Sequence, residues 1–69
     1  MDGRPLATLA RWHRDDGEFV RLGDPICEIE TDKALVDIAA SRDGILRHLA
    51  KIGDAICAGD EVARIDPVQ

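Results

Sequence analysis

The sequence lacks positive charge in excess and lacks long apolar runs, and each shortage excludes a class of protein. With a formal net charge of −5, the chain offers no basic face to displace counterions from phosphates, which argues against nucleic acid binding. No apolar run approaches the roughly eighteen residues needed to span a bilayer. The first five residues lack the apolar centre of a signal peptide. We therefore expect no membrane contact and a cytoplasmic protein.

Cysteine and histidine are also scarce. Cys27 and Cys57 each lie in an apolar stretch without metal-like spacing, so we expect buried, reduced thiols rather than a disulfide. Neither His13 nor His48 has a companion at ligand or catalytic-triad spacing. The sequence thus predicts no metal site and no catalytic residue.

The chain is short and poor in aromatic residues, which limits the size of its core. Sixty-nine residues allow one small domain that buries little surface on folding. We expect Trp12 and Phe19, the only aromatic residues, to anchor this core rather than bind a ligand. The predicted domain covers residues 1–69, with a loose lead-in at 1–5 and a core over about 6–66.

An internal repeat organises the sequence. Between residues 17 and 30, a displacement of 36 residues gives four identical pairs, namely Gly17/Gly53, Gly23/Gly59, Asp24/Asp60 and Ile29/Ile65. The same alignment places Leu9 on Ile45 and Arg11 on Arg47. Two copies are too few for a solenoid, which needs at least about three. A single domain with pseudo-two-fold symmetry is the remaining interpretation.

Periodicity alone leaves helix and strand open for short apolar runs such as Leu6 to Trp12. Glycine-containing turns at intervals of roughly ten residues favour an all-β fold, a sandwich or barrel. We predict a flattened barrel or sandwich of two small antiparallel sheets. The uneven alternation of Ile26, Cys27 and Ile29 predicts a bulge or strong twist. The expected core residues are Leu9, Val20, Ile26, Ile29, Ile38, Ile45, Ile56, Val62 and Ile65.

A predicted hairpin stands apart from the repeat. Two β-prone runs, Ile26 to Glu30 and Leu35 to Ala39, flank a polar segment at residues 31–34, a pattern typical of a β-hairpin. Lys33 is then expected at the tip of the turn. An exposed, hydrated amine is a poor catalyst, but a modifying enzyme can reach it. From the turn alone, an ordinary solvated lysine is the alternative.

The segment Glu-Thr-Asp-Lys-Ala at residues 30–34 resembles the lipoylation site of the lipoyl domains of 2-oxo acid dehydrogenase complexes. In that family the lysine of a Glu-(Thr/Ser)-Asp-Lys-Ala run carries lipoic acid. Gly17 ahead of the hairpin and Gly44 eleven residues beyond the lysine match as well. The resemblance covers residues from about 9 to 65. It implies the family's fold, a flattened barrel of two antiparallel sheets.

The resemblance also implies a function and a set of partners. Lys33 would carry lipoic acid as a swinging arm that shuttles acyl groups and reducing equivalents between active sites, and the domain itself would be a non-catalytic carrier. Glu30, Asp32 and Ala34 would be recognised by the modifying enzyme, a lipoate ligase or lipoyl transferase. The other implied partners are a thiamine-dependent 2-oxo acid decarboxylase, an acyltransferase and dihydrolipoamide dehydrogenase. We expect the isolated domain to be monomeric.

Two other functions stay open. One is a biotin carrier domain of a carboxylase, although biotin carriers usually place Met on both sides of their lysine, where this sequence has Asp32 and Ala34. The other is an unmodified lipoyl-like interaction module. Glu28 and Asp37 are interpreted as solubilising residues on an exposed hairpin. The repeat further predicts that Lys33 and the chain termini lie at opposite ends of the molecule. The resemblance implies a further strand at about Met1 to Arg4, where the composition is poor for a strand, so this edge is either short or frayed, or it pairs despite its composition.

Overall fold

The computed structural model describes residues 6–57 and 59–68; the predicted lead-in at 1–5 and the edge strand at 1–4 lie outside these ranges. The described chain forms seven strands and no helix, and therefore no helix that could cross a membrane. The strands are β1 Ala7–Trp12, β2 Phe19–Val20, β3 Pro25–Glu30, β4 Leu35–Ala39, β5 Gly44–His48, β6 Ala55–Ile56 and β7 Ala63–Asp66. The ambiguous run before Trp12 is thus a strand.

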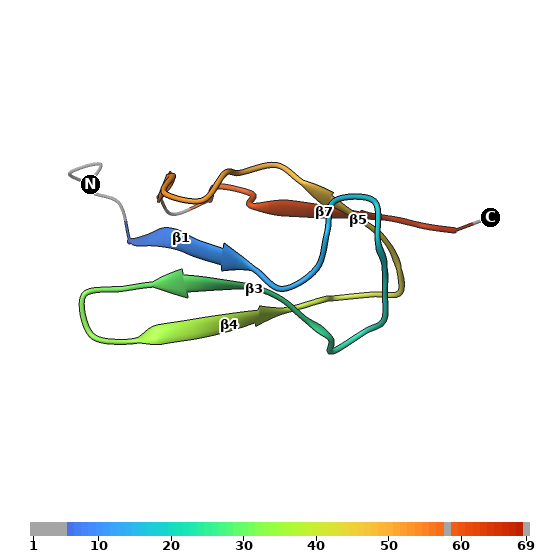
Figure 1. Cartoon of the computed structure of the whole chain (residues 1–69), viewed down its shortest axis with the longest axis horizontal. Coiled ribbons are helices and arrows are strands. Elements are labelled where there is room, and N and C mark those ends of the chain that lie inside the picture. The colour runs from blue at the N-terminus through green and yellow to red at the C-terminus, as the bar shows by residue number, and fades with distance from the viewer. Residues whose placement is uncertain (1–5, 58, 69) are drawn as a thin grey trace.

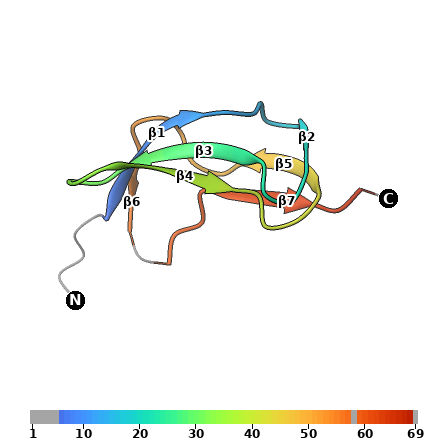
Figure 2. The same ribbon diagram turned by 90° about the horizontal axis from the view of Figure 1, so that it is seen from below.

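The strands form two antiparallel sheets that face each other as a flattened sandwich rather than a closed barrel. One sheet has the order β4-β3-β1-β6 and the other the order β2-β5-β7. Figure 1 shows β5 and β7 in one layer with β1, β3 and β4 in the other. Seen from below, β2, β5 and β7 gather toward the end that carries the C-terminus, and β6 lies toward the other end (Figure 2). The predicted all-β fold is confirmed.

The strand order confirms the predicted pseudo-two-fold symmetry. Moving along the repeat takes β1 to β5, β2 to β6 and β3 to β7, so β6-β1-β3 in one sheet corresponds to β2-β5-β7 in the other. The turns correspond too. Gly23 has a φ of +90° and Gly59 a φ of +87°, a conformation that costs a residue with a Cβ far more than glycine. In both turns an aspartate Oδ2 accepts a backbone N–H, Asp24 from Arg21 at 3.0 Å and Asp60 from Cys57 at 2.8 Å.

A bulge in β1 corrects one pair of the repeat. Ala10 is an extra residue between Leu9 and Arg11 in the β1–β3 ladder, and β5 has no such insertion opposite β7. Arg11 therefore corresponds to Arg47, as predicted, but Leu9 corresponds to Leu46 and not to Ile45. The backbone hydrogen bonds agree, since the N–H of Leu9 binds the Asp54 carbonyl and the N–H of Leu46 binds the Glu18 carbonyl.

The core between the sheets follows this corrected register. Its buried residues are Leu9, Val20, Ile26, Cys27, Ala40 and Leu46. Five more of the predicted core residues are partly buried against them, namely Ile29, Ile38, Ile56, Val62 and Ile65. Ile45 was predicted wrongly, because the one-residue displacement exchanges the faces of a strand and turns Leu46 inward. The bulge predicted within residues 26–29 occurs as a register shift between Pro25 and Cys27.

Trp12 packs partly buried against the core, as predicted, whereas the prediction for Phe19 is wrong. The Phe19 side chain is 46% exposed, and the Arg21 guanidinium lies 6.0 Å from its ring centre. Trp12 and His48 occupy equivalent positions in β1 and β5, and their rings stack at 3.7 Å with an angle of 7° between planes. This stack therefore lies at the pseudo-two-fold axis and joins the two sheets.

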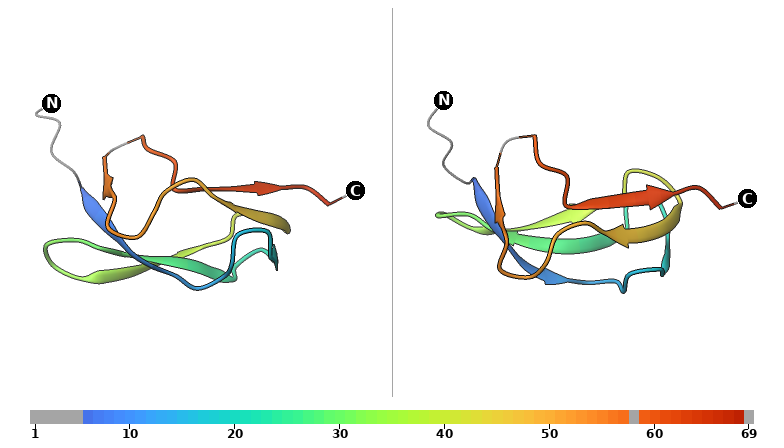
Figure 3. Two further views of the ribbon diagram at one scale, coloured as in Figure 1. Left: turned by 45° about the horizontal axis from the view of Figure 1, so that its top comes forward. Right: turned by 90° about the horizontal axis from the view of Figure 1, so that it is seen from above.

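The predicted separation of the termini from Lys33 is half correct. The turn between β3 and β4 projects at one end, while the chain leaves β7 toward the other end (Figures 1 and 3). However, β1 begins beside the hairpin end, since Thr8 pairs with Glu30. The antiparallel pairing accounts for this difference, because β1 must begin where β3 ends and the hairpin turn starts.

Candidate functional site

The strands β3 and β4 form the longest hairpin in the described chain. Their antiparallel pairs run from Pro25 and Ala39 to Glu30 and Leu35, and residues 31–34 form the turn. The N–H of Thr31 donates to the Ala34 carbonyl at 2.8 Å and closes this turn. The hairpin extends past the body of the sandwich (Figure 3), which leaves even Leu35 58% exposed. A partner enzyme can therefore approach the tip from several sides.

The Thr31 hydroxyl fixes the backbone of the turn. Its Oγ1 accepts hydrogen bonds from the N–H of Lys33 at 3.2 Å and from the N–H of Ala34 at 3.0 Å. The hydroxyl also donates to the Ala34 carbonyl at 3.0 Å. A threonine that bonds the backbone two and three residues on is typical of such turns. Lys33 is therefore mounted on a defined loop although the loop is solvated.

Lys33 is exposed at this tip, where the sequence predicted it. Within residues 6–57 and 59–68, its ammonium group forms no ion pair and no hydrogen bond. Nothing in the described chain has to be broken before an acyl group is attached to this amine, so the site fits an amide-linked group on a long arm. The predicted recognition residues Glu30, Asp32 and Ala34 surround it and are likewise exposed.

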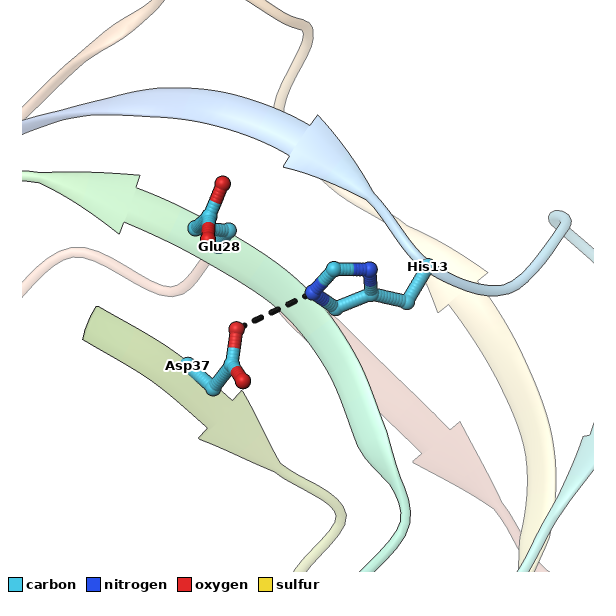
Figure 4. Close-up of side chains that lie close together, drawn as sticks. All are labelled: His13, Glu28 and Asp37. Carbon is cyan, nitrogen blue, oxygen red and sulfur yellow. Dashed lines mark hydrogen bonds and ion pairs between the residues drawn. The ribbon is translucent and has the colours of Figure 1, made fainter. Parts of the chain in front are cut away.

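The outer face of the hairpin holds a cluster that the sequence analysis missed. His13 Nε2 lies 3.0 Å from Asp37 Oδ1, and Glu28 lies on the strand between them (Figure 4). One ligand atom from each of His13, Glu28 and Asp37 lies within 4.8 Å of the others. Glu28 also pairs with Arg11, whose Nε is 3.1 Å from a carboxylate oxygen. Residues 24 positions apart meet here, so spacing along the chain gave no signal.

The thiol of Cys27 lies on the inner face of the same hairpin strand. It is fully buried and free, as the sequence predicted. Burial, and to a lesser degree the negative charge of Asp37, raises the pKa of this thiol from 9.0 to about 11. A thiol of this kind stays protonated at neutral pH and behaves as a small apolar side chain. Cys57 is half-buried.

Comparison with known proteins agrees with this geometry. A family model described as Biotin-requiring enzyme, of the Biotin_lipoyl family, matches residues 3–65. The lipoyl domain of the 2-oxoglutarate dehydrogenase complex from Azotobacter vinelandii superimposes with a TM-score of 0.74 and 31% sequence identity, covering 87% of this chain and 77% of that chain.

Longer curated proteins match over the same region. The mitochondrial pyruvate dehydrogenase protein X component of Mus musculus is 55% identical over 42 residues, which is 61% of this chain and 8% of that protein. The succinyltransferase component of the 2-oxoglutarate dehydrogenase complex of Azotobacter vinelandii is 34% identical over 59 residues, which is 84% of this chain and 15% of that protein. The chain thus spans only a small part of these relatives.

A two-sheet sandwich that raises one lysine on a hairpin defines the class of protein as an attachment domain for a covalently bound cofactor. The chain belongs to the Biotin_lipoyl family, and within it to the lipoyl domains. A domain of this kind is a carrier and performs no catalysis of its own. The family implies lipoic acid on a lysine, and the relatives are components of 2-oxo acid dehydrogenase complexes.

Proposed function

We propose that Lys33 is the lipoyl attachment site and that the domain shuttles acyl groups and reducing equivalents between the active sites of a 2-oxo acid dehydrogenase complex. The observation that carries the proposal is an exposed amine without a partner in the described chain, held at the tip of a projecting hairpin. Of the two lysines in the sequence, Lys33 alone lies on a hairpin of this kind. Lys51 lies in the short turn that leads into β6.

The residues of this chain hold the attachment point at Lys33 and expose it to the partner enzymes. Bound lipoate supplies a dithiolane that can take up an acyl group as a thioester together with reducing equivalents. Thr31 holds the turn so that the attachment point is defined, and the strand pairs behind it carry the point away from the sandwich. Tethering raises the effective concentration of the reactive end at each partner, often to about the millimolar range for short flexible links.

We propose that the modifying enzyme, a lipoate ligase or lipoyl transferase, recognises Glu30, Asp32 and Ala34. All three are exposed beside Lys33. The small Ala34 leaves room at the amine, and the two carboxylates offer charged hydrogen-bond acceptors to a basic partner. The proposed partners of the loaded domain are a thiamine-dependent decarboxylase, an acyltransferase and dihydrolipoamide dehydrogenase, supported by the named components among its relatives. We keep the cytoplasm as the proposed location, since a free thiol such as Cys27 is typical of a reducing compartment.

A biotin carrier is the second candidate, because the family description names biotin-requiring enzymes. The residues flanking Lys33 decide between the two. Asp32 and Ala34 stand where biotin carriers usually have Met. An interaction module without any cofactor is the third candidate, and it requires that Lys33 stay unmodified.

The test is the intact mass of the chain after co-expression with a lipoate ligase in medium that contains lipoate. We expect the mass to rise by one lipoyl group, and Lys33→Arg to abolish the increase. Lys51→Arg is the matched control and should be modified like the parent chain. Addition of biotin by a biotin ligase in its place, or an unmodified chain in both experiments, would overturn the proposal.

A further inference from the structure

The outer face of the lysine hairpin carries charge that the carrier function does not use. Glu28 and Asp37 are direct partners in the β3–β4 ladder, and like charges placed opposite each other across two strands repel. His13, which follows β1, directs its ring into the space beside them (Figure 4). The strands β3 and β4 and the segment that follows β1 thus place one imidazole and two carboxylates on one patch of surface.

We propose that His13, Glu28 and Asp37 form a binding site for a single zinc ion, held by one imidazole nitrogen and two carboxylate oxygens. Zinc accepts this ligand set, with metal–ligand distances of about 2.0–2.2 Å and a water completing the tetrahedron. Tetrahedral ligands at those distances lie about 3.3–3.5 Å apart. His13 Nε2 and Asp37 Oδ1 are already 3.0 Å apart, and the third ligand atom is within 4.8 Å of both.

The surroundings allow the small adjustment that remains. The present partner of Glu28, Arg11, is 65% exposed, whereas Glu28 itself is 19% exposed, so the guanidinium can move into solvent while the carboxylate stays in place. The Asp37 side chain is 59% exposed, which leaves a side of the site for the water ligand. Imidazole favours zinc over the hard cation Mg²⁺, which prefers oxygen ligands in octahedral geometry. A bound ion would tie β4 to β3 and to the end of β1.

The experiment titrates Zn²⁺ into the full chain carrying Lys33→Arg, so that no lipoyl thiol can compete, and follows the imidazole signals by NMR and the heat by calorimetry. We expect one ion per chain and a shift of the His13 signals, with those of His48 unchanged. His13→Gln and Asp37→Asn should each weaken binding at least about tenfold, since loss even of outer partners of a metal ligand costs about 10- to 100-fold.

Glu61→Gln, which removes an exposed carboxylate outside the cluster, and Cys57→Ser are the controls and should bind like the parent. Three outcomes would overturn the proposal: no binding, unchanged Zn²⁺ affinity in His13→Gln, or equally tight binding of Mg²⁺ without a shift at His13. Circular dichroism of each variant before titration ensures that any loss is read on folded protein. None of these outcomes bears on lipoylation, so this proposal and the carrier function can fail independently.

Discussion

The two sheets are built from equivalent strands, yet within residues 6–57 and 59–68 only one of them carries a hairpin. β6-β1-β3 and β2-β5-β7 share strand order, turns and, apart from the bulge at Ala10, ladder register. In the described chain β4 is added to β3 alone, and Lys33 lies in the connection that this addition creates. The comparison teaches that the repeated part forms the two-sheet body, while the proposed attachment site lies in the part that is not repeated.

The largest difference between the two sheets is expected at Gly44, whose equivalent in the other sheet is Ala7. A Cβ at Gly44 would lie 2.3 Å from the carbonyl oxygen of Asp66, and a backbone atom cannot yield cheaply. We expect Gly44→Ala to cost about 3 kcal/mol or more, from a total of roughly 3–10 kcal/mol for a chain of this length. The free energy of unfolding, obtained by urea denaturation of the parent and the variant, measures this loss.

Gly23→Ala is the control for Gly44→Ala, because a Cβ there meets nothing within 4 Å and only the φ of +90° is unfavourable. This substitution should cost about 1–2 kcal/mol. Equal losses at the two glycines would contradict the close approach of β5 and β7, and no loss at Gly23 would contradict the left-handed turn.

The next largest loss of stability is expected at the two buried leucines that the bulge in β1 makes equivalent. Leu9 and Leu46 are both fully buried at equivalent positions, so Leu9→Ala and Leu46→Ala should each cost about 2–5 kcal/mol. Ile45→Ala should cost less than about 1.5 kcal/mol, because this side chain lies outside the buried cluster. Denaturant midpoints compare the stability of the three variants. A larger loss of stability at Ile45 than at Leu46 would support the ungapped alignment, in which Leu9 corresponds to Ile45.

Thr31 tests what the hairpin adds to the repeated body. Thr31→Val removes the hydroxyl that binds the N–H groups of Lys33 and Ala34, and Thr31→Ser keeps it. Since water can replace an exposed hydrogen bond, we expect at most about 1 kcal/mol of lost stability. The initial rate of lipoylation by a ligase should fall severalfold in Thr31→Val and stay near the parent rate in Thr31→Ser. Equal rates would show that the enzyme orders the turn itself.

The smallest effect concerns acid stability of the second sheet. A hydrogen bond from Arg64 is the main reason that the pKa of Asp66 lies below its ordinary value of 3.8; burial, the next largest cause, opposes this shift, and a hydrogen bond from Arg47 and the charges of both guanidinium groups add to the lowering. The unfolded chain therefore binds this proton more readily, so the contribution is complete above about pH 4 and is lost as the pH falls through the folded-state pKa. Asp66→Asn should flatten the decline of the urea midpoint below pH 4; an unchanged decline would assign the acid loss to other carboxylates.

The sequence could predict whatever is encoded locally or by repetition. Glycine turns, alternating apolar residues and the polar segment at 31–34 gave the two sheets, the symmetry and the exposed position of Lys33. Ile45 was misplaced because one inserted residue, Ala10, changes the face of every residue before it, and the alignment had no gap to reveal it. Phe19 was misplaced because β2 is only two residues long, too short for alternation to show which side chain turns inward.

The contacts of the two histidines were beyond sequence reasoning for a different reason. His13 meets Asp37 across 24 residues, and His48 meets Trp12 across the space between the sheets. Such pairs depend on how strands are ordered and on the twist of each sheet, neither of which leaves a spacing in the chain. The same limit applied to the patch formed by His13, Glu28 and Asp37.

The stacked pair of Trp12 and His48 at the pseudo-two-fold axis makes the intrinsic fluorescence of the chain a probe of the contact between the two sheets. Trp12 is the single indole in the sequence and the chain has no tyrosine, so its emission is uncontaminated. The His48 ring is stacked on this indole at a centroid distance of 3.7 Å, so the environment of the emitting ring changes when the stack opens. Any event that separates the two sheets should therefore change the fluorescence of Trp12, and events confined to the lysine loop should leave it unchanged.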